Sequence, residues 1–437
     1  METLGVYIQI PFCASKCSFC NFSSGVVRET VFDGYCHAIG QEIERLTRDS
    51  GSFAPGQRDQ PDGSNGPDGP RGPNGVDPAI WPEDPVFYPP SPVSNPLYPV
   101  SCSLRPVPCD TLYLGGGTPS ILGRERLQGL SEKLRGHFNF TDSPEITIEI
   151  TPGSTDRDLL ESLRRMGCNR LSVGAQSFDD GELRAVGRLH SARETAKQIT
   201  LARAAGFDNI SLDLIGGLPY QTQDSWHESL RAALDLAPEH VSVYLFEVDE
   251  KSRLGREVIE HGRRYHADTV PDDDFMAWAY EAARETLSGA GYTQYEISNF
   301  ARSGFESRHN LKYWELKSYL GLGAGAHSFD GTRRWSNEVS HEVYAAKLAR
   351  GESPVVEARA LSVSEQLEEF FFLGLRQRRG VDLAIAAQRW GEAPIARWDD
   401  TIARLEHEGW IERRHDSIQI PERAYLVSNE IFQEFLL

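Results

Sequence analysis

The sequence lacks a long apolar run and lacks an excess of basic residues. No apolar stretch approaches the roughly 18–20 residues that a membrane-spanning helix needs, and no basic leader precedes the first apolar residues. The 437 residues carry 45 Lys and Arg against 64 Asp and Glu, a formal charge of −19. So acidic a chain argues against a partner bound through nucleic-acid phosphates. We therefore expect neither a nucleic-acid partner nor a transmembrane segment, while transient membrane association stays open.

Cysteine is also scarce, with seven residues in the chain. Three of them lie together near the N-terminus. The other four, Cys36, Cys102, Cys109 and Cys168, show no disulfide-framework spacing. We predict that these four are free thiols and that the protein works in a reducing cytoplasm.

Short β-rich runs alternate with amphipathic stretches along the first 246 residues, which predicts strand–helix units around a parallel sheet. Six such units would close most of a barrel and place polar groups at the C-terminal ends of the strands. The predicted strands are Gly5–Ile10, Thr111–Gly115, Ile146–Ile150, Arg170–Ala175, Asn209–Ile215 and Val241–Phe246. The predicted helices are Val31–Arg48, Arg124–His137, Asp156–Met166, Ser191–Ala205 and Asp224–Leu236.

Two regions depart from this alternation. Residues 51–109 are rich in Pro, Gly, Asp and Ser, and Gly recurs at every third position from Gly63 to Gly75, so we interpret them as a flexible insertion. The pattern of residues 356–437 predicts two helices followed by a short β pair. This order is typical of a winged-helix-like α+β domain. We therefore divide the chain into a barrel (1–50 and 110–250), the insertion, a connecting region (251–355) and a C-terminal domain.

The most informative motif is Cys13-Ala-Ser-Lys-Cys17-Ser-Phe-Cys20, which directly follows the first predicted strand. Three thiolates at C-x3-C-x2-C spacing can hold three irons of a [4Fe–4S] cluster and leave the fourth iron open to a small ligand. The alternative is a zinc knuckle or three unrelated thiols. Zinc prefers four ligands in paired C-x2-C spacings, and no second pair follows. The pattern favours a cluster and is typical of radical S-adenosylmethionine (SAM) enzymes.

Polar residues within the other predicted strands point to a ligand at the same mouth of the barrel. Gly115-Gly116-Gly117-Thr118 ends the second strand, where glycines let a ligand approach backbone N–H groups. Glu149 lies in the third predicted strand, Gln176 directly follows the fourth and Asp213 lies in the fifth. Arg188 belongs to a Gly-Arg-Leu-His run. Each has a structural alternative, a core hydrogen bond or a surface position. Together they favour a polar ligand such as SAM.

Two further motifs contain histidines: His309-Asn-Leu-Lys-Tyr-Trp314 and the glycine-rich Gly321-Leu-Gly-Ala-Gly-Ala-His327. Histidine can ligate haem iron or carry protons. The alternative is a histidine with a structural role.

On these motifs together, the chain resembles the radical-SAM haem chaperones of HemW type, relatives of oxygen-independent coproporphyrinogen III dehydrogenase. The resemblance covers residues 4–50 and 110–437 and implies a partial (β/α)6 radical-SAM barrel with a smaller C-terminal domain. It implies a [4Fe–4S] cluster on Cys13, Cys17 and Cys20, SAM and haem as cofactors, and a haem-acceptor protein as partner.

The resemblance also assigns ligand residues. It implies that Tyr7, Gly116 and Glu149 bind the cluster-bound SAM. It places a second SAM on Phe19, Gly117, Thr118, Gln176, Arg188 and Asp213. It puts Glu247 and His327 near these ligands. Because an axial imidazole is a common haem ligand, we take His327 as the candidate iron contact.

Two departures separate the branches of this family. The dehydrogenase branch has a further cysteine where this chain has Phe22, and it has an N-terminal extension, whereas this sequence starts six residues before Tyr7. Both differences favour a haem chaperone that binds the cluster, SAM and haem and transfers haem to an acceptor. The alternative function is radical-SAM oxidative decarboxylation of the propionates of coproporphyrinogen III.

Overall fold

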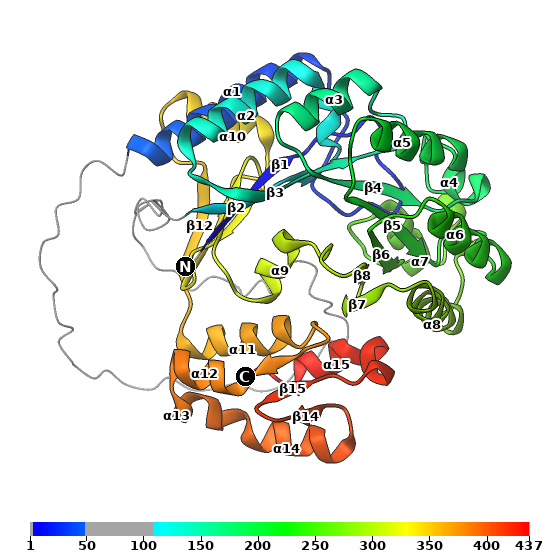
Figure 1. The fold of residues 1–437 in the computed structure, drawn as a ribbon, viewed down its shortest axis with the longest axis vertical. Helices are drawn as coiled ribbons and strands as arrows, with labels where there is room; N and C mark the ends of the chain where they lie inside the picture. The colour runs from blue at the N-terminus through cyan, green and yellow to red at the C-terminus, as the bar shows by residue number, and fades with distance from the viewer. Residues whose placement is uncertain (1–2, 49–107, 437) are drawn as a thin grey trace, which may run out of the picture.

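Six parallel strands form the centre of the molecule, in a computed structural model that describes residues 3–48 and 108–436. The strands pair in chain order, so the curved sheet in Figure 1 is the predicted partial barrel. Most of the predicted insertion, with Cys102 and the glycine triplets, lies outside the described residues. The strands are β1 (Leu4–Ile10), β2 (Cys109–Gly116), β3 (Phe140–Ile150), β4 (Arg170–Gln176), β5 (Ile210–Gly216) and β6 (His240–Leu245).

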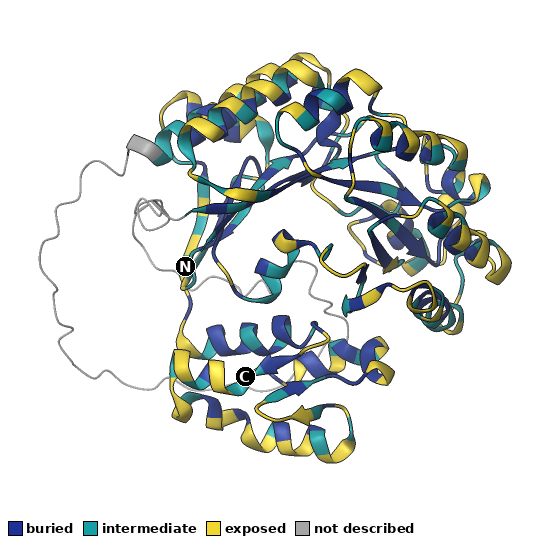
Figure 2. Cartoon of the chain, viewed as in Figure 1, coloured by how far each residue is buried: buried dark blue, intermediate teal, exposed yellow. Residues whose placement is uncertain are grey.

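Helices cover the convex face of this sheet (Figure 1). Side-chain caps mark the starts of several of them, as in the Asp156 cap of α3 and the Ser191–Glu194 capping box of α5. Their apolar faces and the strands share one core, and Figure 2 shows the strands buried and the outer helix faces exposed. The helices are α1 (Thr30–Arg48), α2 (Gly123–His137), α3 (Arg157–Arg165), α4 (Asp180–Ala185), α5 (Ala192–Ala204) and α6 (Gln223–Asp235).

The region between the barrel and the C-terminal domain extends the sheet at both edges. Antiparallel β8 pairs with β6, and β9 pairs in parallel with β1, so the whole sheet has 12 strands. Sequence analysis predicted none of these strands individually. The elements are α7 (Arg253–Ile259), the 3-10 helix η3 (Arg264–Thr269), α8 (Asp273–Gly289), β7 (Thr293–Glu296), β8 (Asn299–Ala301), α9 (Arg308–Trp314), β9 (Tyr319–Leu322), β10 (His327–Phe329), β11 (Arg333–Asn337), α10 (His341–Ala349) and β12 (Val355–Ala360).

Helix α9 lies on the concave side of the sheet, near the N-terminal ends of β1 and β2 (Figure 1). The Glu145 carboxylate accepts the backbone N–H groups of Arg308 and His309, at 3.1 and 3.0 Å, and so stabilises the start of the helix. We call this end of the barrel the floor, and the end where the strands finish the mouth.

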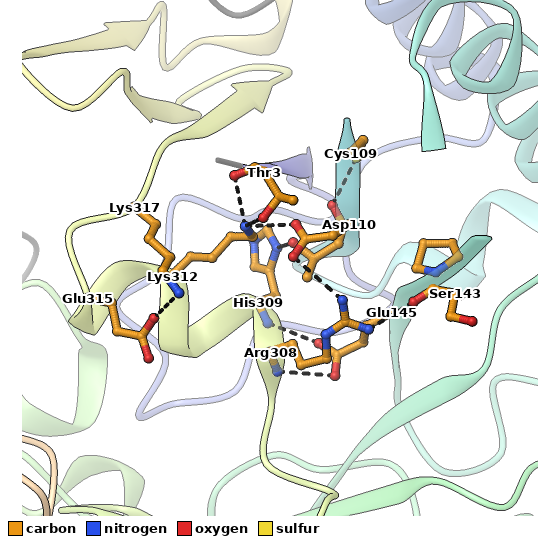
Figure 3. A network of polar contacts seen from close by, with 12 residues as sticks. Thr3, Cys109, Asp110, Ser143, Glu145, Arg308, His309, Lys312, Glu315 and Lys317 are labelled. Carbon is orange, nitrogen blue, oxygen red and sulfur yellow. Dashed lines mark hydrogen bonds and ion pairs between the residues drawn. The ribbon is translucent and has the colours of Figure 1, made fainter. Parts of the chain in front are cut away.

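Polar side chains join α9 to the floor strands, as Figure 3 shows. The His309 ring is hydrogen-bonded through Nδ1 to the Thr111 hydroxyl at 2.8 Å and through Nε2 to the Tyr313 hydroxyl at 2.8 Å. Lys312, 3% exposed, lies 2.7 Å from the Asp110 carboxylate and donates to Thr3. We call His309, Lys312, Thr111, Asp110 and Glu145 the floor network.

The C-terminal residues form a smaller domain with its own apolar core, which includes Phe371, Trp398 and Phe435. A three-stranded sheet packs with its helices, in the order β13-β15-β14. This arrangement fits the winged-helix-like prediction. Its elements are α11 (Val363–Gly374), β13 (Val381–Asp382), α12 (Leu383–Trp390), α13 (Glu392–Ile395), α14 (Asp399–Glu408), β14 (Glu412–Arg414), β15 (Ser417–Gln419) and α15 (Ser428–Gln433). Among the helices described, none is long and apolar enough to cross a bilayer.

Candidate functional site

The cysteine motif forms a loop at the mouth, directly after β1. Cys17 is buried, while Cys13 and Cys20 are half-buried. Neighbouring segments hold the loop through its backbone, since the Ser18 N–H donates to the Val186 carbonyl at 3.0 Å and the Leu254 N–H donates to the Ser18 carbonyl at 2.8 Å. The thiols are therefore positioned by the β4–β5 connection and by α7 as well as by their own spacing.

The donor set of this loop fits an iron–sulfur cluster. All three thiols are free, and Cys13 and Cys20 are close enough to Cys17 to influence its ionisation. Burial raises the pKa of the Cys17 thiol, and the Arg188 guanidinium beside it acts in the opposite direction. Among the described residues, no three His, Cys, Asp or Glu side chains converge to hold a single metal ion. Three thiols that do not converge on one point suit separate corners of a cluster better than they suit the coordination of a tetrahedral zinc ion.

The glycine run after β2 contacts both the cysteine loop and β3. The Gly117 and Thr118 N–H groups donate to the carbonyls of Ile10 and Phe12, at 2.8 and 2.7 Å. A Cβ on Gly117 would lie 2.4 Å from the Phe12 oxygen, so only glycine permits this approach. The Gly116 N–H donates to Glu149 Oε2 at 3.0 Å. Two residues of the set predicted to bind the cluster-bound SAM therefore touch.

Most residues of the barrel strands are buried, but a few positions remain partly exposed. Polar side chains occupy these positions. Tyr7, Glu149 and Asp213 occupy such positions on β1, β3 and β5. Burial raises the pKa of Glu149 to about 7, although its Oε1 accepts a 2.9 Å hydrogen bond from the Tyr113 hydroxyl. Burial also raises the pKa of Asp213, which accepts a hydrogen bond from the Ser172 hydroxyl at 3.2 Å. Asp213 lies in the middle of its strand, not at its end.

The Gln176 and Arg188 side chains both lie over the face of Gly174 where a Cβ would stand. The Arg188 guanidinium donates to the Gly174 carbonyl at 2.9 Å, and a Cβ at Gly174 would collide with both neighbouring side chains. Gln176 has a left-handed backbone with φ of 67°, which is uncommon for a residue other than glycine. Backbone strain of this kind often marks a ligand site. The Arg188 Nε is buried and has no hydrogen-bond partner among the described residues.

The remaining predicted residues are distributed around the mouth. Phe19 packs into an apolar cluster that includes Val186 and Leu254. The Thr118 hydroxyl lies 3.9 Å from Cys13 Sγ. Glu247 follows β6 and is exposed. His327 is half-buried and begins β10, so the predicted glycine-rich loop is a hairpin between β9 and β10.

Sequence analysis missed a buried charge in the interior. The Arg170 side chain is 1% exposed, and its positive charge acts on the ionisation of Glu149, Asp213 and His309. Its Nε has no hydrogen-bond partner within the described part of the chain. The signal was present in β4, where Arg170, Ser172, Gly174 and Gln176 alternate with apolar residues and so share one face.

Comparison with known proteins identifies the class of this fold and site. The profile of the radical SAM superfamily matches residues 104–233, and that of the HemN C-terminal domain matches residues 361–427. The "Heme chaperone HemW" of Bacillus subtilis is 30% identical over 431 residues, covering 98% of each chain. The Mycobacterium tuberculosis protein of the same name is 30% identical and covers 100% of this chain and 95% of its own length. The chain belongs to the HemW family of radical SAM proteins.

A solved structure shows the same fold. Coproporphyrinogen III oxidase (HemN) from Escherichia coli, described as a radical SAM enzyme, matches with a TM-score of 0.78 over 99% of this chain and 90% of its own. At 22% identity this similarity concerns the fold alone. It confirms the predicted α/β barrel with its smaller C-terminal domain. Membership of the radical SAM family implies a [4Fe–4S] cluster and SAM as cofactors.

Proposed function

We propose that the protein is a haem chaperone that carries a [4Fe–4S] cluster, binds SAM and haem, and transfers haem to an acceptor protein. The observation that carries this proposal is the full-length similarity to proteins named "Heme chaperone HemW". The geometry of the mouth supports it, because three free thiols, the glycine run and Glu149 lie together there. The six described cysteines are free, which suits a reducing compartment such as the cytoplasm.

We assign the cluster to Cys13, Cys17 and Cys20. In this family an open iron supplies a binding point for SAM and a source of electrons. The residues of this chain would orient the ligand: Gly116 through its backbone and Glu149 through a carboxylate that accepts from ammonium or hydroxyl groups. Tyr7 stacks at 5.9 Å on Tyr113, which in turn donates to Glu149, so the first predicted SAM group is one connected unit.

We place the second set of predicted SAM residues at the same mouth. Asp213 and Arg188 carry opposite charges that influence each other, and Arg188 bonds the backbone beside Gln176. These residues offer hydrogen bonds and charges either to a second polar ligand such as SAM or to the propionates of haem. Phe19, Gly117 and Thr118 connect it to the cysteine loop.

The decisive experiment is anaerobic reconstitution of the cluster, followed by parallel assays of haem binding and of coproporphyrinogen III turnover. We expect about one haem per chain, and transfer of that haem to a haem-free acceptor protein. We expect no decarboxylation. Steady conversion of coproporphyrinogen III with SAM and a reductant, in the absence of haem binding, would replace the chaperone by the dehydrogenase.

A further inference from the structure

One arginine in the interior of the barrel has no protein partner. Arg170 begins β4 and is 1% exposed. Its guanidinium makes no hydrogen bond and no ion pair with any residue that the structure describes, and its Nε is buried. Arg334 on β11, by contrast, donates to both oxygens of Glu369, at 2.7 and 2.8 Å. Because a buried charge without a partner is strongly unfavourable, we expect Arg170 to be kept for a ligand.

A second donor without a partner lies beside this arginine. Thr147 on β3 pairs in register with Arg170, and its Oγ1 is buried without a hydrogen-bond partner among the described residues. The neighbours Ile146, Ile148 and Leu171 belong to the core beneath the helices. Side chains alternate along a strand, so Thr147 and Arg170 both face the interior. A guanidinium beside a hydroxyl matches the two oxygens of a carboxylate.

The two carboxylates nearest in charge do not neutralise this arginine. The positive charge of Arg170 acts on the ionisation of Glu149 and Asp213, but neither carboxylate forms an ion pair with it. Both are held by other donors, Glu149 by the Tyr113 hydroxyl and Asp213 by the Ser172 hydroxyl. Burial raises the pKa of Glu149 to about 7, so this group is only partly ionised at neutral pH. An anionic ligand group would complete the charge balance.

The interior around these groups is open to solvent and lined by aromatic rings. Tyr244 on β6 is 43% exposed, whereas Val241 and Val243 of the same strand lie in the core beneath the helices. The alternation therefore turns the Tyr244 side chain to the interior. Tyr7 on β1 is also partly exposed and stacks on Tyr113. Tyrosine rings offer flat apolar surfaces, which suit a planar ligand.

The position of Arg170 along the strands separates it from the predicted SAM carboxylate. Through the register of β2, β3 and β4, Arg170 lies level with Tyr113, whereas Gly116 ends β2 at the mouth. At about 3.3 Å per residue, the distance along the strand between these two levels is about 10 Å. The open iron at the mouth takes the methionine end of SAM in the predicted arrangement. A carboxylate at Arg170 then belongs to a different ligand.

We propose that Arg170 and Thr147 bind one propionate carboxylate of haem inside the barrel. Arg170 donates N–H groups to the propionate oxygens, and the Thr147 hydroxyl donates a further hydrogen bond. The porphyrin ring lies between this anchor and the mouth, against the Tyr7 and Tyr244 side chains. This inference rests on the proposed haem-binding function and adds residues that hold the cargo by its acidic edge.

The test uses the full chain with its reconstituted cluster and ferric haem as the probe. The central variant is Arg170→Met, which removes the charge and keeps a long side chain. Thr147→Val removes only the hydroxyl, since valine is also β-branched and suits a strand. The matched control is Arg203→Met in the outer helix α5, because Arg203 is paired with Glu239 at 2.9 Å. The ligand control is haem dimethyl ester, in which both propionates are esterified.

We expect Arg170→Met to bind haem about tenfold more weakly and Thr147→Val a few-fold more weakly, with SAM affinity unchanged in both. The wild type and Arg170→Met should bind haem dimethyl ester equally weakly. Before haem is added, Arg170→Met should melt at the wild-type temperature or slightly above it, because an unpaired buried charge is removed. Arg203→Met should melt at a lower temperature and keep its haem affinity.

Unchanged haem affinity in Arg170→Met, or equal affinities of the wild type for haem and its dimethyl ester, overturns the inference. Weaker SAM binding with unchanged haem binding would assign Arg170 to the SAM carboxylate instead. Should Arg170→Met not fold, Thr147→Val decides, and an undiminished preference of that variant for haem over the ester overturns the inference. A wild-type protein that binds no haem overturns the proposed function itself, so the two failures are distinct.

Discussion

The mouth and the floor of the barrel are both polar, but their side chains are paired in different ways. At the floor, both nitrogens of His309 have protein partners. Both oxygens of Glu145 and the ammonium of Lys312 are also paired (Figure 3). At the mouth, the Nε of Arg188, the Nδ1 of His190 and the hydroxyl of Ser18 are buried without a hydrogen-bond partner among the described residues. Unpartnered buried groups are not confined to the mouth, since the Nε of Arg170 at the start of β4 is another. The difference lies in α9, whose hydrogen bonds close the floor, whereas the unpartnered groups beside the cysteine loop offer hydrogen-bonding capacity to a ligand.

The largest expected effect is loss of the cluster when the mouth is altered. Replacing Cys13, Cys17 or Cys20 by Ser removes one thiolate of three, and we expect iron and the brown colour to be lost after anaerobic reconstitution. Iron analysis and absorption spectra measure this. Cys36→Ser, in the outer helix α1, is the matched control and should keep its iron. Iron loss in that control would show that the cluster lies elsewhere.

The next largest effect concerns stability and belongs to the floor. His309→Ala leaves a cavity and removes the hydrogen-bond partner of the Thr111 and Tyr313 hydroxyls. We therefore expect the free energy of unfolding to fall by about 3 kcal/mol. Thermal unfolding measures it, with the exposed His227→Ala on α6 as the control. A stable His309→Ala variant that no longer binds haem would instead make the floor a haem site.

The same residue predicts a pH dependence. Burial lowers the pKa of His309 from 6.5 to about 3, so the unfolded chain binds a proton that the folded chain does not. The stability that the neutral His309 ring contributes to the folded protein is fully present above pH 6.5 and is lost as the pH falls from 6.5 toward about 3. We expect the melting temperature of the wild type to drop more steeply between pH 7 and 5 than that of His309→Phe. Parallel slopes would contradict this.

A smaller effect is expected for ligand binding at the mouth. Glu149→Gln removes a carboxylate but keeps the shape, and we expect about tenfold weaker SAM binding with the cluster retained. Because burial raises the pKa of Glu149 to about 7, the wild type should bind the cationic ligand more tightly at pH 8 than at pH 6. Calorimetry on both proteins tests this. If the wild type binds SAM equally well at pH 6 and pH 8, Glu149 is a core residue that takes no part in SAM binding.

The smallest effect is expected from the predicted insertion. Its composition is too poor in apolar residues to offset the entropy of ordering. In the sequence it joins the end of α1 to the start of β2, whereas the cysteine loop follows the end of β1. Replacing residues 55–100 by a short Gly/Ser linker should change neither iron content nor melting temperature. A large fall in either would show that this segment stabilises the barrel.

Much of the barrel could be predicted because its signals are local. Apolar runs of strand length alternate with amphipathic helices, and the cysteine spacing and glycine run are each contained within a few residues. The edge strands β9 to β12 could not be predicted, because they are short and their pairing depends on the sheet that they extend. Helix α9 was noticed only as an unusual motif, since its partner Thr111 is 198 residues away in sequence.

The sequence by itself determined which groups this protein can use: three thiols at cluster spacing, a glycine run, and acids and an arginine within strands. These follow from residue type and spacing, which folding does not change. The tertiary structure decided which polar group is paired and which is not. Burial and pairing arise from contacts between distant segments, so His309 became part of a closed floor, while Arg170 was left in the interior without a hydrogen-bond partner among the described residues.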